Sequence, residues 1–257
     1  MKTKFIILGC GSSLGVPRAD GHWGKCNPKQ KKNYRTRCSA FIKSRIGNIL
    51  IDTSPDLRHQ LINNNIKNID KVLYTHMHGD QVHGINDLRV FALKSKKKIP
   101  IYADIETAKY LKKNFSYCFK NTPSYRSILK LNTLKKKMIL KKNGKSIIIK
   151  SIPVQHGRIK SQSFIINKSC AYISDGNKIF NKDLKYFKNM KYLVIDCLRL
   201  NSHPSHFNLS EVIHLSKILK PKKTILTNLN NDMDYNKLLK KLPKNIVPAY
   251  DGMSLII

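Results

Sequence analysis

The chain has 257 residues and a formal net charge of +34, which allows one large α/β domain, residues 1–257, with a buried core. A charge this high is typical of proteins that bind nucleic acid or anionic membranes. The excess is nearly all lysine, however, and the lysines are dispersed and have few aromatic neighbours that could stack on bases. We therefore expect a solvated basic surface that attracts an anionic substrate, and we keep nucleic-acid binding as an alternative.

Short β-branched runs alternate with helical patterns along the chain. The predicted strands are Lys4–Leu8, Ala40–Lys43, Asn48–Asp52, Lys71–Tyr74, Ile99–Tyr102, Ser146–Ile152, Ser163–Ile166, Ala171–Ser174, Tyr192–Asp196, Thr224–Leu226, Ile246–Val247 and Leu255–Ile257. The predicted helices are Pro55–Asn64, Ile85–Lys94, Glu106–Lys113, Leu209–Lys220 and Tyr235–Lys241. Strands this numerous, with helices that do not strictly alternate, favour two packed mixed sheets with helices on the outer faces.

Two local patterns refine this scheme. Asn208 can cap the helix that follows it while Glu211 reaches back, which is the pattern of a capping box. The lysine-rich stretch from Asn132 to Lys145 predicts a loop or a hairpin before a strand.

The cysteines and the apolar runs indicate the compartment. Six cysteines without a C-x-x-C pair argue against a disulfide framework and favour a reducing environment. Leu8-Gly9-Cys10 imitates a lipoprotein signal, but the apolar stretch before it is shorter than the about 7 to 15 residues of a signal peptide. No apolar run approaches the roughly 18 residues of a membrane span. We expect a soluble cytoplasmic protein that does not contact a membrane.

A cluster of metal-ligating side chains follows the apolar run Lys71–Tyr74. It reads T-His76-M-His78-G-Asp80-Gln81-V-His83. Two imidazoles one residue apart, with a carboxylate two residues later, cannot all share one face of a helix or a strand, so they suit a tight loop around an ion. The alternative is a polar turn with solvated histidines, although nothing in a plain turn requires this composition.

Other titratable side chains also follow the ends of apolar runs. Functional residues tend to lie on loops at one rim of a sheet scaffold. Each of these residues alone is also typical of a turn that ends a strand, but together they predict one functional rim. They are Asp52, His76, His156, Asp175 and Asp196.

The motifs resemble those of the metallo-β-lactamase fold, whose metal signature is T-H-x-H-x-D-H, and the resemblance extends over nearly the whole chain. Besides the His76 cluster they include Gly9-C-G-S-S-L-Gly15-V-Pro17, Pro153-V-Q-His156-G, Ile173-S-Asp175, His203-P-S-His206-F and Ala249-Y-Asp251-Gly252-Met253. The glycine-rich start and the D-G-M tail are most similar to the branch that contains the phosphoribosyl cyclic phosphodiesterase of bacterial phosphonate catabolism.

The resemblance implies an αββα sandwich with a site for two divalent ions. The first ion would be held by His76, His78 and His156, with Asp175 bridging to the second. The second would use Asp80 and two histidines. This chain has Asp80, but Gln81 and Asn228 stand where the two histidines would be. Asp52, His83 and His203 are candidates for a supporting role.

Both departures, Gln81 and Asn228, therefore fall on the same ion. Amide oxygens are poor ligands for zinc but can coordinate Mn²⁺ or Mg²⁺. We expect one tightly bound zinc ion, and a second site that binds manganese or magnesium weakly or no ion at all. The related phosphodiesterase also has a structural zinc site of several cysteines near its N-terminus. This chain offers only Cys26 there, so we predict that the site is absent.

The resemblance also implies the reaction, which is metal-dependent hydrolysis of a small anionic phosphate ester, cyclic or open. Asp80 and His206 are the expected catalytic residues, with His206 as the general acid to the leaving alkoxide. An imidazole suits that task because its unperturbed pKa of about 6.5 lies near working pH.

Two other functions remain open. An RNA-processing nuclease of the transfer-RNA 3′ end type is favoured by the net charge of +34, and the third reading is a non-hydrolytic protein that keeps the fold. A homodimer is left open as well.

Overall fold

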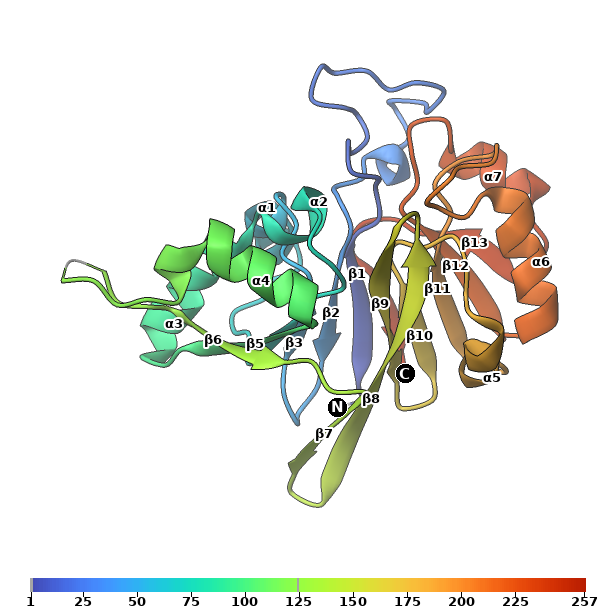
Figure 1. Cartoon of the computed structure of the whole chain (residues 1–257). Coiled ribbons are helices and arrows are strands. Elements are labelled where there is room, and N and C mark those ends of the chain that lie inside the picture. The colour runs from blue at the N-terminus through green and yellow to red at the C-terminus, as the bar shows by residue number, and fades with distance from the viewer. Residues whose placement is uncertain (1, 124) are drawn as a thin grey trace.

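Two seven-stranded mixed sheets packed face to face form the centre of the molecule (Figure 1). The computed structural model describes residues 2–123 and 125–257. The first sheet has the order β14 (Met253–Ile256), β1 (Lys4–Gly9), β2 (Ser39–Lys43), β3 (Ile49–Ile51), β4 (Lys71–Leu73), β5 (Ile99–Ala103) and β6 (Leu129–Thr133). The second has the order β13 (Ile246–Pro248), β12 (Lys223–Thr227), β11 (Tyr192–Asp196), β10 (Cys170–Ile173), β9 (Ile159–Ile166), β8 (Lys145–His156) and β7 (Lys137–Lys142).

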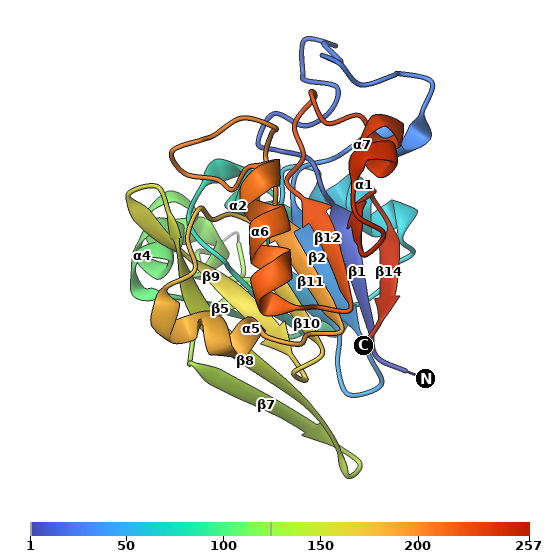
Figure 2. The same cartoon turned by 90° about the vertical axis from the view of Figure 1, so that its right-hand side faces the viewer.

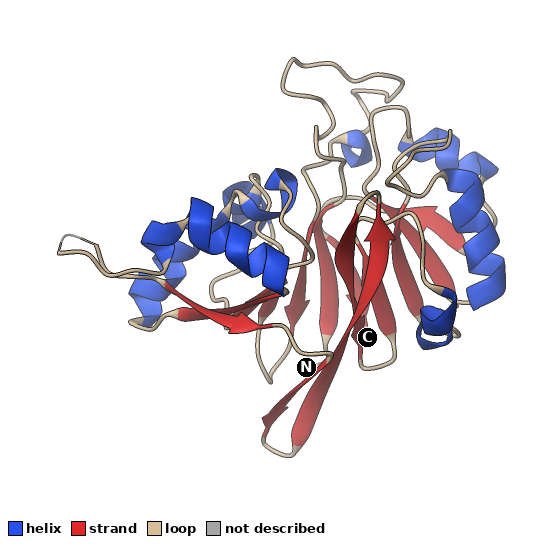
Figure 3. Ribbon diagram, viewed as in Figure 1, coloured by secondary structure: helices blue, strands red, loops and turns tan. Residues whose placement is uncertain are grey.

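Helices cover the outer face of each sheet (Figure 3). Those on the first sheet are α1 (Leu57–Asn63), α3 (Arg89–Ser95) and α4 (Ile105–Asn114), and those on the second are α5 (Leu184–Phe187), α6 (Leu209–Leu219) and α7 (Tyr235–Lys241). Figure 2 shows α6 crossing in front of the second sheet. A short helix, α2 (Gly79–Val82), lies in the loop after β4. The predicted αββα sandwich is therefore confirmed, and this is the metallo-β-lactamase fold.

Period-two alternation of apolar residues builds the layers. Along β1, Phe5 and Ile7 point into the layer between the sheets, whereas Ile6 and Leu8 pack under the helices. Across the central layer the Phe5 ring lies against Tyr172 of the second sheet, with ring centroids 5.4 Å apart. Because strands of both sheets contribute to one apolar layer, the two sheets are held at a set distance and angle.

Every predicted strand has a counterpart, but β6 and β7 are additional strands. Among the boundaries, β8 runs on to His156 instead of ending before Pro153. The extension is stabilised by pairing with β9 through a tight turn at Gly157, whose φ of +56° favours glycine. The helix predicted over 85–94 divides into a 3-10 turn, Ile85–Leu88, and α3. In the 3-10 turn the i and i+3 side chains eclipse, which buries Ile85 and Leu88 on one face.

The lysine-rich stretch, predicted as a loop or a hairpin before a strand, contains β7, which pairs with β8 to form a hairpin. It projects from the body at the end opposite to the β8–β9 turn (Figure 1). β7 is an edge strand, and its exposed Lys137, Lys141 and Lys142 are the kind of residue that discourages edge-to-edge pairing. The capping box of Asn208 and Glu211 at α6 is confirmed too.

Two further findings concern the cysteines and the helices. All six cysteines are free and buried. Within residues 2–123 and 125–257, no helix has the length and apolar character that crossing a bilayer would require.

The Asp251 carboxylate fastens three distant segments at the edge of the first sheet. It accepts hydrogen bonds from the Cys10 backbone N–H (3.0 Å), the Thr36 backbone N–H (2.7 Å) and the Thr36 hydroxyl (2.6 Å). Burial raises its pKa to about 6, although these hydrogen bonds oppose the rise. The D-G-M tail therefore joins the glycine-rich start to the segment before β2.

We expect Asp251→Asn to destabilise the fold by about 2–4 kcal/mol, because an amide in place of the carboxylate turns one hydrogen-bond acceptor into a donor facing other donors. Urea denaturation monitored by circular dichroism measures the loss. The exposed Asp232→Asn is the control, with an expected change within about 0.5 kcal/mol. An Asp251→Asn midpoint equal to that of the control would contradict the role.

Candidate metal centre

The ends of strands from both sheets meet at one rim of the sandwich. Asp52 follows β3 and His76 follows β4 in the first sheet, whereas Asp175 follows β10 and Asn228 follows β12 in the second. The Gln162 backbone N–H of β9 donates to the Thr75 carbonyl at 2.9 Å and so joins the two halves beside His76. The residues predicted to form one rim are therefore neighbours in space.

Three imidazoles converge at this rim. His76 Nε2 lies 3.0 Å from His78 Nδ1, and His78 Nδ1 lies 3.2 Å from His156 Nε2. The ring planes are steeply inclined, with centroids 4.5 to 5.0 Å apart. The arrangement turns three ring nitrogens toward a common point, as ligands of a tetrahedral zinc site do.

In His76 and His156, the ring nitrogen that points away from the cluster forms a hydrogen bond that selects the tautomer of the ring. The Thr75 hydroxyl donates to Asp52 Oδ2 at 2.9 Å, so its oxygen can only accept from His76 Nδ1–H, 3.0 Å away. His156 Nδ1 donates to the Ser205 carbonyl at 2.7 Å. In both rings Nε2 is thus left with a free lone pair facing the cluster, which is the state a metal ligand requires.

Burial keeps these two imidazoles neutral. It lowers the pKa of His76 well below the usual range, and the nearby His156 and His78 lower it further. It lowers the pKa of His156 to about 4, even though the hydrogen bond to the Ser205 carbonyl opposes this. Neutral nitrogen donors with oriented lone pairs fit a divalent zinc ion.

A second group of side chains adjoins the first. His156, Asp175 and His206 bring ligand atoms within 4.8 Å of one another. His206 Nδ1 donates to Asp196 Oδ2 at 2.7 Å, and Asp196 also accepts from the Gly176 backbone N–H at 2.9 Å. Burial alone would lower the pKa of His206, but the charge and hydrogen bond of Asp196 raise it to about 9.

The carboxylates of Asp80 and Asp175 lie close enough to repel one another. Burial and the neighbouring Asp80 raise the pKa of Asp175 to about 8. A cation or a set of hydrogen-bond donors is needed to stabilise two such carboxylates in their charged form.

The side-chain amides at positions 81 and 228 supply such donors. Gln81 Nε2 donates to Asp80 Oδ2 (3.1 Å) and to Asp175 Oδ2 (3.2 Å). Asn228 Nδ2 donates to Asp175 Oδ1 (3.2 Å). Gln81 Oε1 is buried and has no hydrogen-bond partner among the described residues. The amides thus turn hydrogens, not lone pairs, toward the carboxylates.

Two residues of the rim have left-handed backbone. Asp52 has φ +63° and Asn228 has φ +59°, and both are buried. Asparagine and aspartate adopt this region more readily than other non-glycine residues, but it still costs energy and is frequent at functional sites.

The supporting candidates occupy three different positions. Asp52 acts on His76 through Thr75. The His203 ring lies 5.0 Å from that of His206, and both side chains line a cavity of about 210 Å³ that also contacts His78, His156 and Asp175. His83 points elsewhere, since its Nε2 lies 3.3 Å from the Tyr110 hydroxyl and its ring contacts Phe115.

Cys26, the cysteine considered above for a structural zinc site near the N-terminus, contacts a buried arginine. Arg35 Nη1 lies 3.8 Å from its sulfur, and the same guanidinium donates to the carbonyls of Asn230 and Met233. The absence of a zinc ion there stays a prediction.

Sequence reasoning assigned no role to two residues that orient the cluster. Thr75 precedes His76 directly, so the T-H dipeptide was the available signal. The Ser205 carbonyl belongs to the backbone of a loop 49 residues away from His156, and no side-chain pattern marks it.

A family model described as Beta-lactamase superfamily domain matches residues 47–227. The chain belongs to the β-lactamase superfamily. The matched residues include all three converging imidazoles as well as Asp175, Asp196 and His206, whereas Asn228 lies just beyond them.

Solved structures of this superfamily support the same placement. The crystal structure of a diphosphatase of the PhnP family has 28% sequence identity and a TM-score of 0.89, and the match covers 99% of this chain and 97% of that one. This supports the PhnP-like branch. Zn²⁺-bound PqqB from Methylobacterium extorquens (16% identity, TM-score 0.77, 99% and 100% covered) and the short form of human tRNase Z (16%, 0.70, 99% and 99%) share the fold.

A relative from Porphyromonas gingivalis, named octanoyltransferase, is 30% identical over 258 residues. The match covers 99% of this chain but 51% of the relative, so the chain spans about half of that protein's length. The name octanoyltransferase was given to the whole relative, and this chain matches about half of it.

We expect Thr75→Val to weaken zinc binding about 10- to 100-fold, because His76 Nδ1–H would lose its acceptor and the ring its orientation. Competition with a chromophoric chelator measures the affinity without relying on turnover. The exposed Thr122→Val serves as the control. A folded Thr75→Val protein with unchanged zinc affinity would show that the Asp52–Thr75–His76 chain does not act on the metal.

Proposed function

We propose that this chain is a metal-dependent phosphodiesterase that acts on a small anionic phosphate ester and holds one zinc ion tightly. The observation that carries the proposal is the convergence of His76, His78 and His156 beside the His206–Asp196 pair at one small cavity. The 28% identity to a PhnP-family diphosphatase over nearly the whole chain adds support for phosphate chemistry.

The three imidazoles would hold the ion. When bound, a divalent ion at this position supplies the Lewis acidity that polarises a phosphoryl oxygen and lowers the pKa of a water molecule. Asp80 and Asp175 lie beside it and would complete its coordination or accept a proton from the attacking water.

His206 is the proposed proton donor to the leaving alkoxide. Asp196 engages Nδ1 and thereby leaves Nε2 as the nitrogen available to substrate in the cavity. A buried carboxylate that orients an imidazole in this way holds the correct tautomer during proton transfer. The cavity of about 210 Å³ has room for a phosphate group with a small substituent.

An RNA-processing nuclease is the second candidate, and the net charge of +34 is the observation that favours it. A long RNA substrate with several phosphate contacts would make log affinity fall steeply with log salt concentration, whereas a small phosphate ester gives a shallow dependence. The basic β7–β8 hairpin lies at the far end of the molecule from the imidazole cluster (Figure 1). We therefore expect the shallow dependence.

The first test uses the leaving group. His206→Asn should lower kcat about 10²- to 10⁴-fold on adenosine 2′,3′-cyclic phosphate, whose leaving alkoxide needs a proton. The loss on bis-p-nitrophenyl phosphate should be much smaller, because p-nitrophenolate leaves without one. Steady-state assays with added Zn²⁺ measure both, and the exposed His214→Asn is the control. Equal losses on both substrates would remove His206 from the role of acid.

The second test concerns the ion count. Wild-type protein should retain about one zinc ion per chain after dialysis, and Gln81→His with Asn228→His should retain about two, because two neutral amides become imidazole ligands. Metal analysis by mass spectrometry measures the content. Asn114→His with Asn143→His adds two exposed imidazoles and is the control. Two zinc ions in the wild type would contradict the single-ion proposal.

A further inference from the structure

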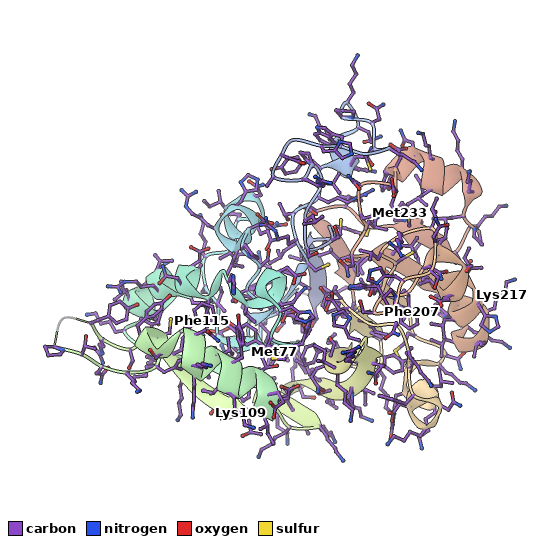
Figure 4. All side chains as sticks on the ribbon, turned by 45° about the horizontal axis from the view of Figure 1, so that its top comes forward. Met77, Lys109, Phe115, Phe207, Lys217 and Met233 are labelled. Carbon is purple, nitrogen blue, oxygen red and sulfur yellow. The ribbon has the colours of Figure 1, made fainter. Side chains whose placement is uncertain are left out.

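A cavity of about 680 Å³ opens beside the imidazole cluster, and no step proposed so far uses it. It lies between the N-terminal end of α4 and the β8–β9 turn, with His76 and Met77 in its lining. Figure 4 labels Met77 close to α4. The volume falls within the about 300–1,000 Å³ that small-molecule sites occupy.

The large cavity and the small one meet at the cluster. His76 lines the large cavity, whereas His78 and His156 line the small one, and the His76 and His78 ring centroids are 4.5 Å apart. A phosphodiester has two substituents on phosphorus. If one leaves on the side of His206, the other needs space of its own, and the adjoining cavity of about 680 Å³ supplies more of it than the cavity of about 210 Å³.

The polar wall of the large cavity is already held together. The Gln162 amide accepts from the Ser151 hydroxyl (2.7 Å) and donates to Asp104 Oδ2 (3.3 Å). The other oxygen of Asp104 caps α4 by accepting from the Thr107 N–H at 2.9 Å. The cavity therefore keeps its shape without a ligand, as preformed sites do.

The groups left free define the chemistry of a ligand. Met77, Ile105, Leu134 and Ile159 give an apolar lining, and Ile105 is 66% exposed. Two cations, Arg158 and Lys160, lie in the same lining.

The two carboxylates in this lining have partners within the protein, whereas the two cations have no ionic partner among the described residues. Glu106 pairs with Lys109 at 3.1 Å, and Asp104 caps α4. Arg158 and Lys160 are exposed, and within the described part of the chain their side chains form no ion pair. A ligand that is apolar in part and anionic in part matches both features.

We propose that this cavity binds the non-leaving substituent of the phosphodiester, and that this substituent is a nucleoside carrying a further phosphate. A planar base suits the Met77 thioether and the Arg158 guanidinium, which both pack well on aromatic faces. The additional phosphate would lie on Arg158 and Lys160. The proposal rests on the proposed phosphodiesterase function and names its substrate class.

The test compares three p-nitrophenyl esters with zinc-loaded protein. They are methyl p-nitrophenyl phosphate, thymidine 5′-(p-nitrophenyl phosphate) and the 3′-phosphorylated form of the latter. We expect kcat/KM to rise about 10-fold when thymidine replaces methyl, because apolar surface becomes buried, and about 5-fold more with the 3′-phosphate. Equal values for all three esters would overturn the assignment of the cavity.

Variants locate the effect. Ile105→Ala should lower the thymidine-to-methyl ratio about 5-fold, and Arg158→Ala should lower the gain from the 3′-phosphate about 5-fold. Lys217→Ala removes a positive charge from α6, on the far side of the molecule in Figure 4, and should leave both ratios unchanged. Ratios that stay at wild-type values in Ile105→Ala and Arg158→Ala would place the nucleoside elsewhere.

A binding measurement separates this proposal from the proposed function. Calorimetry with thymidine 3′,5′-bisphosphate should show binding that weakens about 5-fold in Arg158→Ala, whether or not any ester is turned over. Absence of turnover of all three esters with this binding intact would overturn the phosphodiesterase function alone. Turnover of the methyl ester without binding of the bisphosphate would overturn the cavity assignment alone.

Discussion

The apolar layer shared by the two sheets is the constraint on which the rest of the structure depends. Phe5 and its neighbours on the first sheet pack against Tyr172 and its neighbours on the second, so neither sheet can shift without exposing the layer. This fixes the ends of the strands relative to one another. The Gln162 to Thr75 hydrogen bond then joins the halves next to His76. A site built from loops of both halves gains its precision from this packing.

The electrostatics of the rim give the substitutions at positions 81 and 228 a physical meaning. Asp80 is close enough to Asp175 to disfavour the negative charge of Asp175. A second divalent ion would relieve that repulsion, and so would hydrogen-bond donors. Gln81 and Asn228 turn amide hydrogens toward the carboxylates, so part of the demand for a second cation is already met by the protein itself. Under the single-ion proposal, both residues would lower the affinity for a second ion.

The positive charge of the chain is partly dispersed over the surface and partly placed beside the imidazole cluster. Most of the +34 is carried by lysines on exposed surfaces, including the hairpin that points away from the rim, and salt screens such charges over about 8–10 Å. Arg158 and Lys160 differ because they lie beside the imidazole cluster in a cavity with an apolar lining. Cations beside low-dielectric walls act on a nearby ligand more strongly than the diffuse charge does.

Local patterns predicted much of the architecture. Period-two alternation and β-branched runs placed every strand but β6 and β7, and the Asn208 capping box marked the start of α6, because these signals depend on neighbours within a few residues. β6 was missed because its five residues, Leu-Lys-Leu-Asn-Thr, include no Val, Ile or aromatic residue, and the extension of β8 to His156 was missed because Pro153 reads as a break. The His76 cluster was visible since its ligands are adjacent in the chain.

The sequence by itself therefore determined the kind of fold and the identity of the metal-ligand candidates, because both can be recognised from patterns of residue types a few positions apart in the chain. Only the tertiary structure decided how those residues are oriented. The tautomers of His76 and His156, the inward-facing amides of Gln81 and Asn228, and the cavity beside Met77 all depend on contacts between residues 23 to 94 positions apart in the chain. Such contacts exist only after the two sheets have packed, so no local pattern records them.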